Sequence, residues 1–527
     1  MHSFLQRFAL LVAGVLHGFD RLVFKGKLCP LYSPEGMNCL LRANHVLFRD
    51  FKKYAFDVTT QVLTASQVAQ ARTRNRFRYL PSGKIDKEAV AREIASAHRV
   101  RTGLVCVLQC VEPCWSFDKA TTAEGQLIIR GEPSRCSHLY HYYVHPQFGW
   151  MYVRLQTWFP FEIQVGLNGR EWLARQMDRE KIGYVRSDNK FLHVPNWQRA
   201  QQLLDLQLQT DWRKELDALQ QQVHPLHPGH LGRMPLQYNW TTFQSEWATD
   251  VAFREQRILE PWFDRWLRQG VLTYNSRDIL RFFGQAPALY RKGRTRIETS
   301  VHARFEGKRL KHWVDHNSLK LYTHANILRA ETTINTAEKI GVQRPVSHDP
   351  EGPTARRPMR RTVADLPQRA TYCQSVNDRY LEALATTAET RTLRELAEPL
   401  TRRVAEPLAK PRSTPEPPTR YVRGLNPLAA ADAALLIAIS DPKWLVHGLR
   451  NRDLVAALYP TATEDSLERR HRSARVTRLL RLLRGHGLLE KIPGTHRYQV
   501  GAHARIQIQA LLACRNANPD ELVTKAA

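Results

Sequence analysis

The sequence predicts an α+β protein with a large amino-terminal body of mixed sheet and helix, a proline-rich linker and a smaller carboxy-terminal domain. Up to about residue 340, apolar runs of strand type alternate with amphipathic helical patterns. This alternation favours a sheet covered by helices over a helical bundle or an all-β sandwich. Residues 399–418 hold six prolines and almost no large apolar residues, which is typical of an extended linker. We therefore expect four segments, at 1–340, 341–398, 399–420 and 421–527.

Composition restricts the classes of function. The 527 residues include 78 Lys and Arg against 50 Asp and Glu, so the formal net charge is +28. A charge of this size favours a polyanionic partner, most commonly nucleic acid. The 43% of hydrophobic residues excludes a disordered chain, and no run approaches the roughly 18 apolar residues of a membrane span, so no membrane partner is expected. Eight cysteines without a dense framework indicate a reducing, cytoplasmic location.

The expected elements follow from periodicity and from breaker residues. Strands are expected at 21–28, 104–110, 138–144, 150–158, 318–322 and 327–334, and helices at 87–97, 170–181, 198–221 and 371–398. Pro399 is expected to stop the last helix, and proline-containing steps predict an exposed loop at 347–361. The apolar run Phe8–Leu16 is expected to form a packed helix ahead of the first strand, and not a secretory signal.

The carboxy-terminal domain has a clear pattern. Three helices are expected at 432–440, 449–458 and 467–484, followed by a hairpin of strands at 488–492 and 497–500. The third helix carries an apolar stripe at Val476, Leu479, Leu480 and Leu483. At about 100° per residue, its opposite side presents three arginines. These are Arg475, Arg478 and Arg481.

This domain resembles the winged-helix family of DNA-binding domains, on the residues Ser473–Arg484, Gly487–Leu489 and Thr495–Tyr498. The resemblance predicts a winged helix-turn-helix fold. It implies that the third helix enters the major groove with Arg475, Arg478 and Arg481, and that His496 and Arg497 lie on the wing. Two alternatives stay open: the arginines only solvate an exposed helix face, or the domain binds protein or RNA.

A second resemblance is local. Lys320-Leu321-Tyr322 and Ile327–Glu331 alternate as two strands of a hairpin. They resemble the strand pair near the metal site of rolling-circle replication initiators, which makes Tyr322 and Glu331 candidate catalytic residues. The match covers about fifteen residues and departs from the family, because His324 replaces its second lysine and its histidine–hydrophobic–histidine triplet is not found. A solvated hairpin edge is the alternative.

The run His138–His145 suggests a metal site. On a strand, His141, Tyr143 and His145 share one face. With a carboxylate such as Glu331 or Asp20, the two imidazoles would hold a divalent metal, Mg²⁺ or Mn²⁺, that polarises a scissile phosphate. The same residues also suit base stacking, or an ordinary sheet face with hydrogen-bonded histidines.

Other groups complete the set of candidates. Tyr380, which follows Arg379, and Tyr372 could attack a phosphodiester. The acids Asp20, Glu112, Asp250 and Glu331 would form a two-metal nuclease or transposase centre of the ribonuclease-H kind if three of them met. Four cysteines and a histidine form a further group, in which core packing is expected for the first two cysteines and zinc is the alternative. They are Cys106, Cys110, Cys114, Cys136 and His138.

These observations favour a DNA-binding protein, specifically a mobile-element replication initiator or a transposase-like enzyme that acts on phosphodiester bonds. A metal-dependent nuclease or strand transferase is the candidate activity. One alternative is a non-catalytic winged-helix regulator, and the other is an RNA-binding factor that uses Tyr143, Trp150 and Trp158 as an aromatic sheet face. Assembly of identical subunits is left open. Proximity of Glu331 to His141 or Asp20 would favour catalysis.

Overall fold

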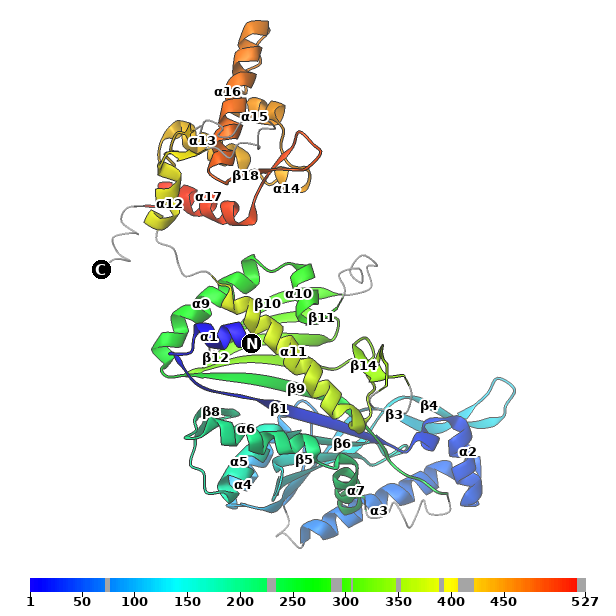
Figure 1. Cartoon of the computed structure of the whole chain (residues 1–527). Coiled ribbons are helices and arrows are strands. Elements are labelled where there is room, and N and C mark those ends of the chain that lie inside the picture. The colour runs from blue at the N-terminus through cyan, green and yellow to red at the C-terminus, as the bar shows by residue number, and fades with distance from the viewer. Residues whose placement is uncertain are drawn as a thin grey trace. The chain divides into compact units, whose positions relative to one another are not determined.

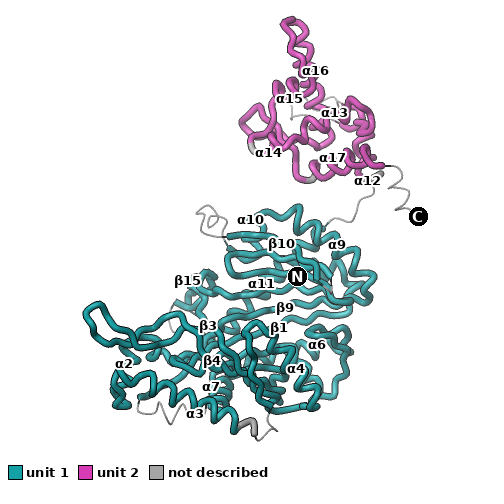
Figure 2. The backbone as a smooth tube through the Cα atoms, turned by 180° about the vertical axis from the view of Figure 1, so that it is seen from behind, with its two compact units in different colours: residues 1–387 teal, residues 388–527 magenta. Residues whose placement is uncertain are grey.

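The protein divides into two compact units, Met1–Thr387 and Ala388–Ala527 (Figure 2). We describe them from a computed structural model. The residues that the structure describes are 1–71, 76–224, 234–285, 296–304, 307–346, 352–387, 393–405 and 421–518. Within these ranges, no helix is both long enough and apolar enough to cross a membrane.

One mixed sheet organises the first unit. Among the described residues, eleven strands pair in the order β10-β11-β12-β13-β9-β1-β6-β5-β4-β3-β2 (Figure 1). Every neighbouring pair is antiparallel except β2 and β3. The strands are β1 (Val12–Lys27), β2 (Phe77–Tyr79), β3 (Gly103–Thr121), β4 (Leu127–His145), β5 (Gly149–Gln156), β6 (Ile163–Asn168), β9 (Asn239–Phe253), β10 (Ile297–Arg304), β11 (Gly307–Val314), β12 (Asn317–His324) and β13 (Ile327–Ile334). The α+β class predicted from the sequence is confirmed.

The two halves of this sheet share one connectivity. β1 is followed by helices and then by β3, β4, β5 and β6, which run back toward it until β6 pairs with β1. In the same way, β9 is followed by helices and by β10 to β13, until β13 pairs with β9. The halves meet where β1 pairs with β9 along most of its length. The centre of the sheet is therefore built by residues far apart in the sequence.

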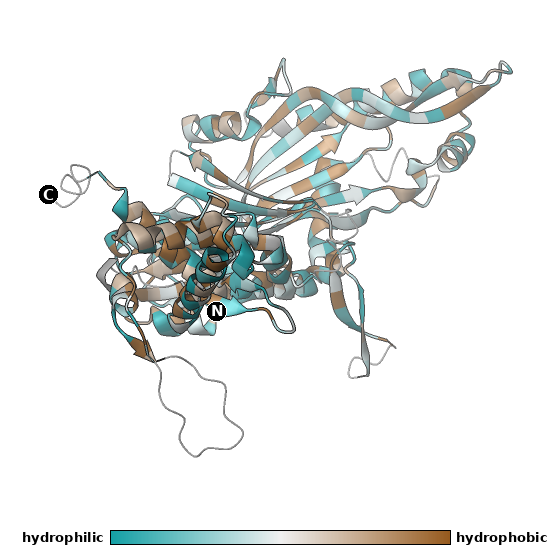
Figure 3. Cartoon of the chain, turned by 90° about the horizontal axis from the view of Figure 1, so that it is seen from above, coloured by the Kyte–Doolittle hydropathy of each residue, from teal (hydrophilic) through white to brown (hydrophobic). Residues whose placement is uncertain are grey.

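Helices cover the sheet and, among the described residues, enclose three apolar cores. The helices of the first unit are α1 (His2–Arg7), α2 (Pro34–Ala43), α3 (Phe51–Ala71), α4 (Lys87–Ala97), α5 (Gly169–Arg179), α6 (Trp197–Asp205), α7 (Trp212–Val223), α9 (Gln256–Leu272), α10 (Ser276–Phe282) and α11 (Leu366–Ala385). α11 crosses β9 and β13 (Figure 1), and Val376 packs there against Leu319 and Leu321. Hydrophilic and hydrophobic residues alternate along the strands (Figure 3), as expected for a sheet with faces of different character.

Two expected helices differ in the structure. The first helix is α1, and the run expected as helix from Phe8 enters β1 at Val12, because this stretch pairs with β9. The single helix expected at 198–221 is two helices, α6 and α7. Asp211 separates them, because its carboxylate caps the start of α7 by accepting from the backbone N–H of Lys214.

The expected boundary at residue 340 also differs. The first unit continues to Thr387, since α11 buries Cys373, Val376 and Leu384 in its cores. A hairpin, β14 (Gly341–Pro345) with β15 (Thr354–Pro358), occupies part of the expected loop. The helix expected at 371–398 is also different, because α11 ends at Ala385 and Pro399 does not stop a helix. Pro399 lies inside α12 (Leu393–Thr401), where it removes one hydrogen bond near the helix end. Most of the expected linker, residues 406–420, lies outside the described residues.

The second unit has its own apolar core. Its helices and strands are α12, β16 (Val404–Ala405), β17 (Tyr421–Val422), α13 (Ala430–Ile439), α14 (Trp444–His447), α15 (Asn451–Leu458), α16 (Ser466–Gly485), β18 (Leu489–Lys491), β19 (Tyr498–Val500) and α17 (Ala502–Arg515). The expected order of three helices and a hairpin is present, with α14 and α17 as additions. Val476, Leu480 and Leu483 of α16 are buried in the core, as the apolar stripe predicted.

Candidate functional site

Three carboxylates converge at the centre of the sheet. Asp20 of β1, Glu246 of β9 and Glu331 of β13 each offer an oxygen atom, and these oxygens all lie within 4.8 Å of one another. A β-bulge positions Asp20: Phe19 pairs with Trp247 and Arg21 with Glu246, which leaves Asp20 as the extra residue. Bulges of this kind re-aim a side chain and are frequent beside active sites. The sequence thus brings together acids from three separate segments.

Cations hold these acids in place. Lys320 of β12 pairs directly opposite Glu331, and its ammonium contacts the Glu331 carboxylate and, at 3.4 Å, Glu246. Arg329 donates to Asp20 at 2.9 Å and to Asp250 at 2.8 Å, and its side chain is 1% exposed. These pairs compensate the cost of burying the carboxylates.

A second guanidinium enters from outside the sheet. Arg170, in the first turn of α5, lies 3.0 Å from the Asp250 carboxylate and donates to the backbone carbonyl of Ala248 at 3.1 Å. Its Nε and Nη1 atoms are buried, and they have no hydrogen-bond partner among the described residues. Asn189 donates to Asp20 at 3.4 Å. Asp250 is thus held between Arg329 and Arg170, and it is not one of the three converging carboxylates.

The electrostatic environment divides the acids into two kinds. Burial alone would raise the pKa of Glu331, but Lys320 and Arg329 outweigh it and hold this pKa at about 2. Burial, followed by repulsion from Glu331, raises the pKa of Glu246 above its usual value. Glu246 is also the most exposed of the three, with 17% of its side chain accessible against 3% for Glu331 and 8% for Asp20. Glu246 is therefore suited to exchange a proton, and Glu331 to remain ionised.

The donor set suits a hard divalent cation. Carboxylate oxygens are the ligands that Mg²⁺ and Mn²⁺ prefer. In an octahedral Mg²⁺ site opposite oxygens are about 4.2 Å apart and adjacent ones about 2.9 Å, so a metal would draw the three acid oxygens, which lie within 4.8 Å of one another, closer together. The Lys320 ammonium, which contacts two of the three acids, would have to turn away from them. The residues present can hold the metal, in competition with this lysine.

Tyr322 lies beside the carboxylates. Its hydroxyl donates to the Glu331 carboxylate at 2.7 Å. Burial and the Glu331 charge raise its pKa well above 10, which keeps the phenol protonated. Because the phenolate is the nucleophilic form, this environment does not favour attack by Tyr322.

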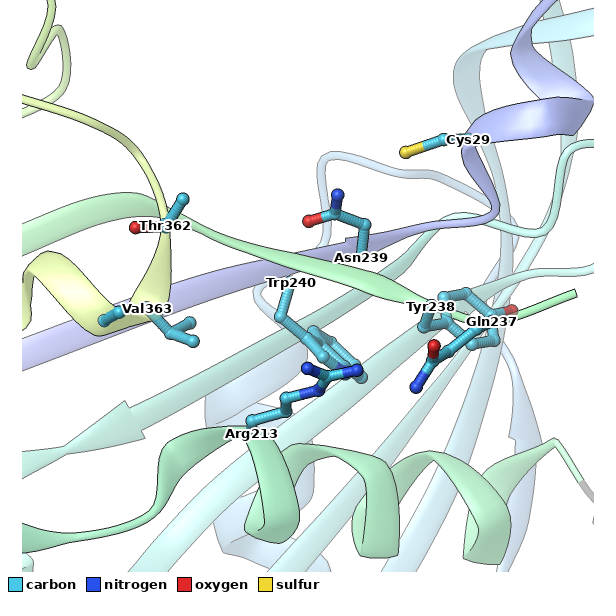
Figure 4. A pocket seen from close by; sticks show the side chains of 9 residues that line it. Cys29, Arg213, Gln237, Tyr238, Asn239, Trp240, Thr362 and Val363 are labelled. Carbon is cyan, nitrogen blue, oxygen red and sulfur yellow. The ribbon is translucent and has the colours of Figure 1, made fainter. Parts of the chain in front are cut away.

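A cavity lies at some distance from the three carboxylates. Its volume is about 420 Å³, and Figure 4 shows Arg213 of α7 and Trp240 of β9 among its lining residues. Trp240 is six residues from Glu246, or about 20 Å along the strand. This cavity is therefore separate from the carboxylate site.

The histidines proposed as metal ligands are not near Glu331. His141 lies on β4, and β5, β6, β1 and β9 separate it from β13, a distance of about 24 Å at 4.8 Å per strand. His141 is buried and its Nε2 lies 2.6 Å from the Ser66 hydroxyl. His145 accepts from the backbone N–H of Gln147, at 3.2 Å, in the turn after β4. The expected grouping of His141, His145 and Glu331 is thus replaced by Asp20, Glu246 and Glu331.

The other candidates of the first unit have structural surroundings. Tyr380 is fully buried and its hydroxyl lies 2.9 Å from Nε2 of His312, so a DNA strand cannot reach it. The Tyr372 hydroxyl donates to a backbone carbonyl. Glu112 of β3 forms ion pairs with Lys87 and Arg154, and β4, β5 and β6 separate its strand from β1.

Two of the cysteines and the aromatic residues have structural surroundings as well, whereas Cys114 lies beside Cys136, with 3.2 Å between their sulfur atoms. Cys106 and Cys110 are core residues, as expected. Tyr143 packs into one apolar cluster and Trp150 into another, so they do not form the continuous aromatic face that RNA binding would use.

Buried histidines predict acid sensitivity of the first unit. Burial lowers the pKa of His138, His141 and His312 to about 4, below the ordinary value of 6.5. Between about pH 6.5 and 4 the unfolded chain binds protons that the folded chain does not, so the free energy of unfolding should fall with pH. Urea unfolding at several pH values would measure this fall. His312→Gln should flatten it, whereas the exposed control His98→Gln should not. An equal slope in both variants would contradict the prediction.

The second unit presents a strongly basic helix. Within α16 seven arginines accompany a single acid, Glu468. The arginines are Arg469, Arg470, Arg472, Arg475, Arg478, Arg481 and Arg484. Arg475, Arg478 and Arg481 are all exposed, and Nη1 of Arg475 donates to the Tyr459 hydroxyl at 3.4 Å.

The two basic residues of the hairpin that follows α16 have different surroundings. His496 is exposed in the turn between β18 and β19. Arg497 donates to the His447 carbonyl at 2.9 Å, which ties the hairpin to α14. The sequence placed both residues on a wing, but only His496 extends away from the body of the unit.

Three functional residues were missed in the sequence. Glu246 lies four residues before Asp250 on the same strand, so the period-two rule would have placed both on one face. Lys320 was noted for its pattern and not for a role as counter-ion. Arg170 carries no sequence signal that points to the site, because its position depends on how α5 leaves β6.

Comparison of the chain with family models, curated proteins and solved structures finds no match.

Proposed function

We propose that the chain is a DNA-binding protein of the mobile-element kind that cuts or transfers phosphodiester bonds with a divalent metal, as a replication initiator or transposase does. The observation that carries this proposal is the convergence of Asp20, Glu246 and Glu331 from three strands. Such acid sets hold Mg²⁺ or Mn²⁺ in enzymes of phosphoryl transfer. The net charge of +28 supports a polyanionic substrate.

In this proposal the three acids and the cations around them have different roles. When bound, the metal supplies Lewis-acid polarisation of a phosphoryl oxygen. Asp20 and Glu331 hold their charge toward it, since Arg329 and Lys320 keep these carboxylates oriented. Glu246, the most exposed of the three acids, would complete the set of oxygen ligands. Lys320 leaves the acids and faces the phosphate charge.

A cleavage assay tests this proposal. The full chain is incubated with labelled single- and double-stranded DNA in Mg²⁺, Mn²⁺ or EDTA, and the products are separated on a denaturing gel with and without protease. We expect metal-dependent cleavage without a protease-sensitive adduct, because Tyr322 remains protonated. Tyr322→Phe should retain cleavage within about tenfold, a smaller loss than removal of a catalytic nucleophile causes. A covalent adduct that Tyr322→Phe abolishes would show instead that this tyrosine is the nucleophile.

In the same proposal, the second unit binds the DNA duplex through α16. Replacing Arg475 and Arg478 by Gln should weaken binding and lower the slope of log K against log salt by about 1.8, since each phosphate contact contributes about 0.9. Mobility-shift titrations at several salt concentrations measure this slope. Arg402→Gln, at an exposed arginine that follows α12 in the same unit, should leave the slope unchanged. An unchanged slope in the double variant would argue against α16 as the DNA-binding helix.

A non-catalytic regulator is the second candidate, and one observation favours it. Lys320 and Arg329 already neutralise Glu331 and Asp20, so the three acids are stable as a structural ion-pair network. In that case the full chain shifts DNA in a salt-sensitive manner and cleaves neither substrate with any metal. The cleavage assay therefore separates the two candidates.

A further inference from the structure

A cationic cavity adjoins the carboxylate site. Its volume is about 150 Å³, and it lies between the hairpin of β7 (Val185–Ser187) with β8 (Lys190–His193), the end of β10, the start of β11 and the end of β12. Among the described residues that line it, four are cations and one, Asp188, is an acid. The cations are Lys190, Arg304, Lys308 and Arg309. Tyr322 joins the cavity to the site, because its side chain lines the cavity while its hydroxyl contacts Glu331.

Two cationic side chains beside this cavity form no ion pair. Within the described ranges, the side chains of Arg309 and Lys311 of β11 make no ion pair or hydrogen bond, and Nε of Arg309 is buried without a partner. Glu246 and Glu331 attract both of them but are already paired with Lys320. Lys311 pairs directly opposite Lys320, and like charges opposite each other destabilise a sheet. Burial, Lys320 and Arg309 lower the pKa of Lys311 to about 8. Its ammonium contacts only the face of Trp313, 3.4 Å from the ring centre. An anion would relieve this repulsion.

The size of the cavity selects the anion. Sites for whole small molecules measure about 300–1,000 Å³, so 150 Å³ admits a group such as a phosphate and not a nucleoside. Arg309 and Lys311 are two residues apart on one strand face, about 6.8 Å, and Lys311 lies outside the cavity. A small phosphorylated molecule held in the cavity would leave Lys311 unpaired. A chain with repeated phosphates reaches both cations.

We propose that this cavity and Lys311 bind consecutive phosphates of a nucleic-acid strand, next to the bond on which Asp20, Glu246 and Glu331 act. The inference rests on the proposed function in taking nucleic acid as the ligand. It assigns Arg309 and Lys311 as strand-binding residues. Tyr322 forms the wall between the bound phosphate and the acids. Unlike the arginines of α16, these residues belong to the first unit.

Binding in EDTA tests the proposal without cleavage. The probe is a fluorescently labelled hexathymidylate, measured by anisotropy with the full chain in an Arg475→Gln/Arg478→Gln background, which removes the exposed arginines of α16. Adding Arg309→Gln and Lys311→Gln should weaken binding at least tenfold and lower the salt slope by about 1.4, at 0.7 per phosphate of a single strand. Inorganic phosphate should compete. The control Arg257→Gln, an exposed arginine of the same unit, should bind as the background does.

Each outcome decides a separate question. If the double variant binds the hexathymidylate as tightly as the background, the proposal is wrong. If inorganic phosphate binds and the hexathymidylate does not, the cavity takes a small anion and the proposal is also wrong. If binding depends on Arg309 and Lys311 but no metal gives cleavage, the strand-binding site stands and the proposed activity fails. If cleavage survives undiminished in the double variant, the activity stands and the strand-binding site fails.

Discussion

Arg329→Ala is expected to lower the free energy of unfolding of the first unit by about 3–5 kcal/mol. Arg329 is the shared counter-ion of Asp20 and Asp250, and all three side chains are buried. Removing the guanidinium leaves two carboxylates without their main partner in a region of low dielectric. The cost exceeds that of losing a surface ion pair, which is typically below about 1 kcal/mol.

Urea unfolding followed by tryptophan fluorescence measures this effect. Of the 12 tryptophans, only Trp444 lies in the second unit, so the signal reports the first. Arg257→Ala, which removes an exposed arginine paired with Glu255, is the matched control and should change stability by less than about 1 kcal/mol. Arg329→Lys keeps the positive charge, so its loss of stability should be smaller than that of Arg329→Ala. Some loss should remain, because a lysine cannot contact both acids. A loss for Arg329→Ala no larger than that of the control would contradict the ion-pair network.

Glu331→Gln is expected to abolish metal-dependent cleavage, with a loss of more than about 100-fold. The amide keeps the shape of the side chain but removes a negative charge that would face the metal, which corresponds to several kcal/mol of transition-state stabilisation. Glu246→Gln should also reduce cleavage, because it removes another of the three converging carboxylates. Glu338→Gln provides a control, since Glu338 is exposed and pairs with Arg361.

The fluorescence unfolding curve of each variant separates loss of chemistry from loss of fold. Glu331→Gln also removes an ion-pair partner of Lys320, so some destabilisation is expected. A folded Glu331→Gln protein that cleaves at the wild-type rate would exclude the three acids as the metal site. A folded, inactive variant that still binds DNA supports it.

Periodicity was sufficient for the class of fold and for several strands. The range 327–334, expected as a strand, is β13, and 87–97 is α4. What local pattern could not provide was the strand order, because pairing of β1 with β9 joins residues more than 200 positions apart. Without that order, His141 and Glu331 could be imagined on neighbouring strands, whereas four strands separate them.

The candidate site, like the fold, could be predicted only in part from the sequence. Glu331 was named on the local resemblance to the strand pair of replication initiators, and Asp20 as an acid of the first strand that could complete a metal site. Their partners were not named, since Arg170 reaches the acids from the start of a helix and Asp20 is turned toward them by a bulge. Tyr380 was misjudged because burial of an entire helix face depends on the sheet beneath α11.

The meeting of β1 with β9 also has a consequence for the newly synthesised chain. Asp20 and Arg329, which contact each other in the folded protein, are 309 residues apart. At 5–20 residues per second, a ribosome adds those residues in about 15 to 60 s. Throughout that interval Asp20 lacks its Arg329 counter-ion, although β6 and then β9, the two strands that pair with β1, are made earlier. The nascent chain therefore cannot bring Asp20, Glu246 and Glu331 together before β13 is made, and the candidate site forms only after about two thirds of the chain has left the ribosome.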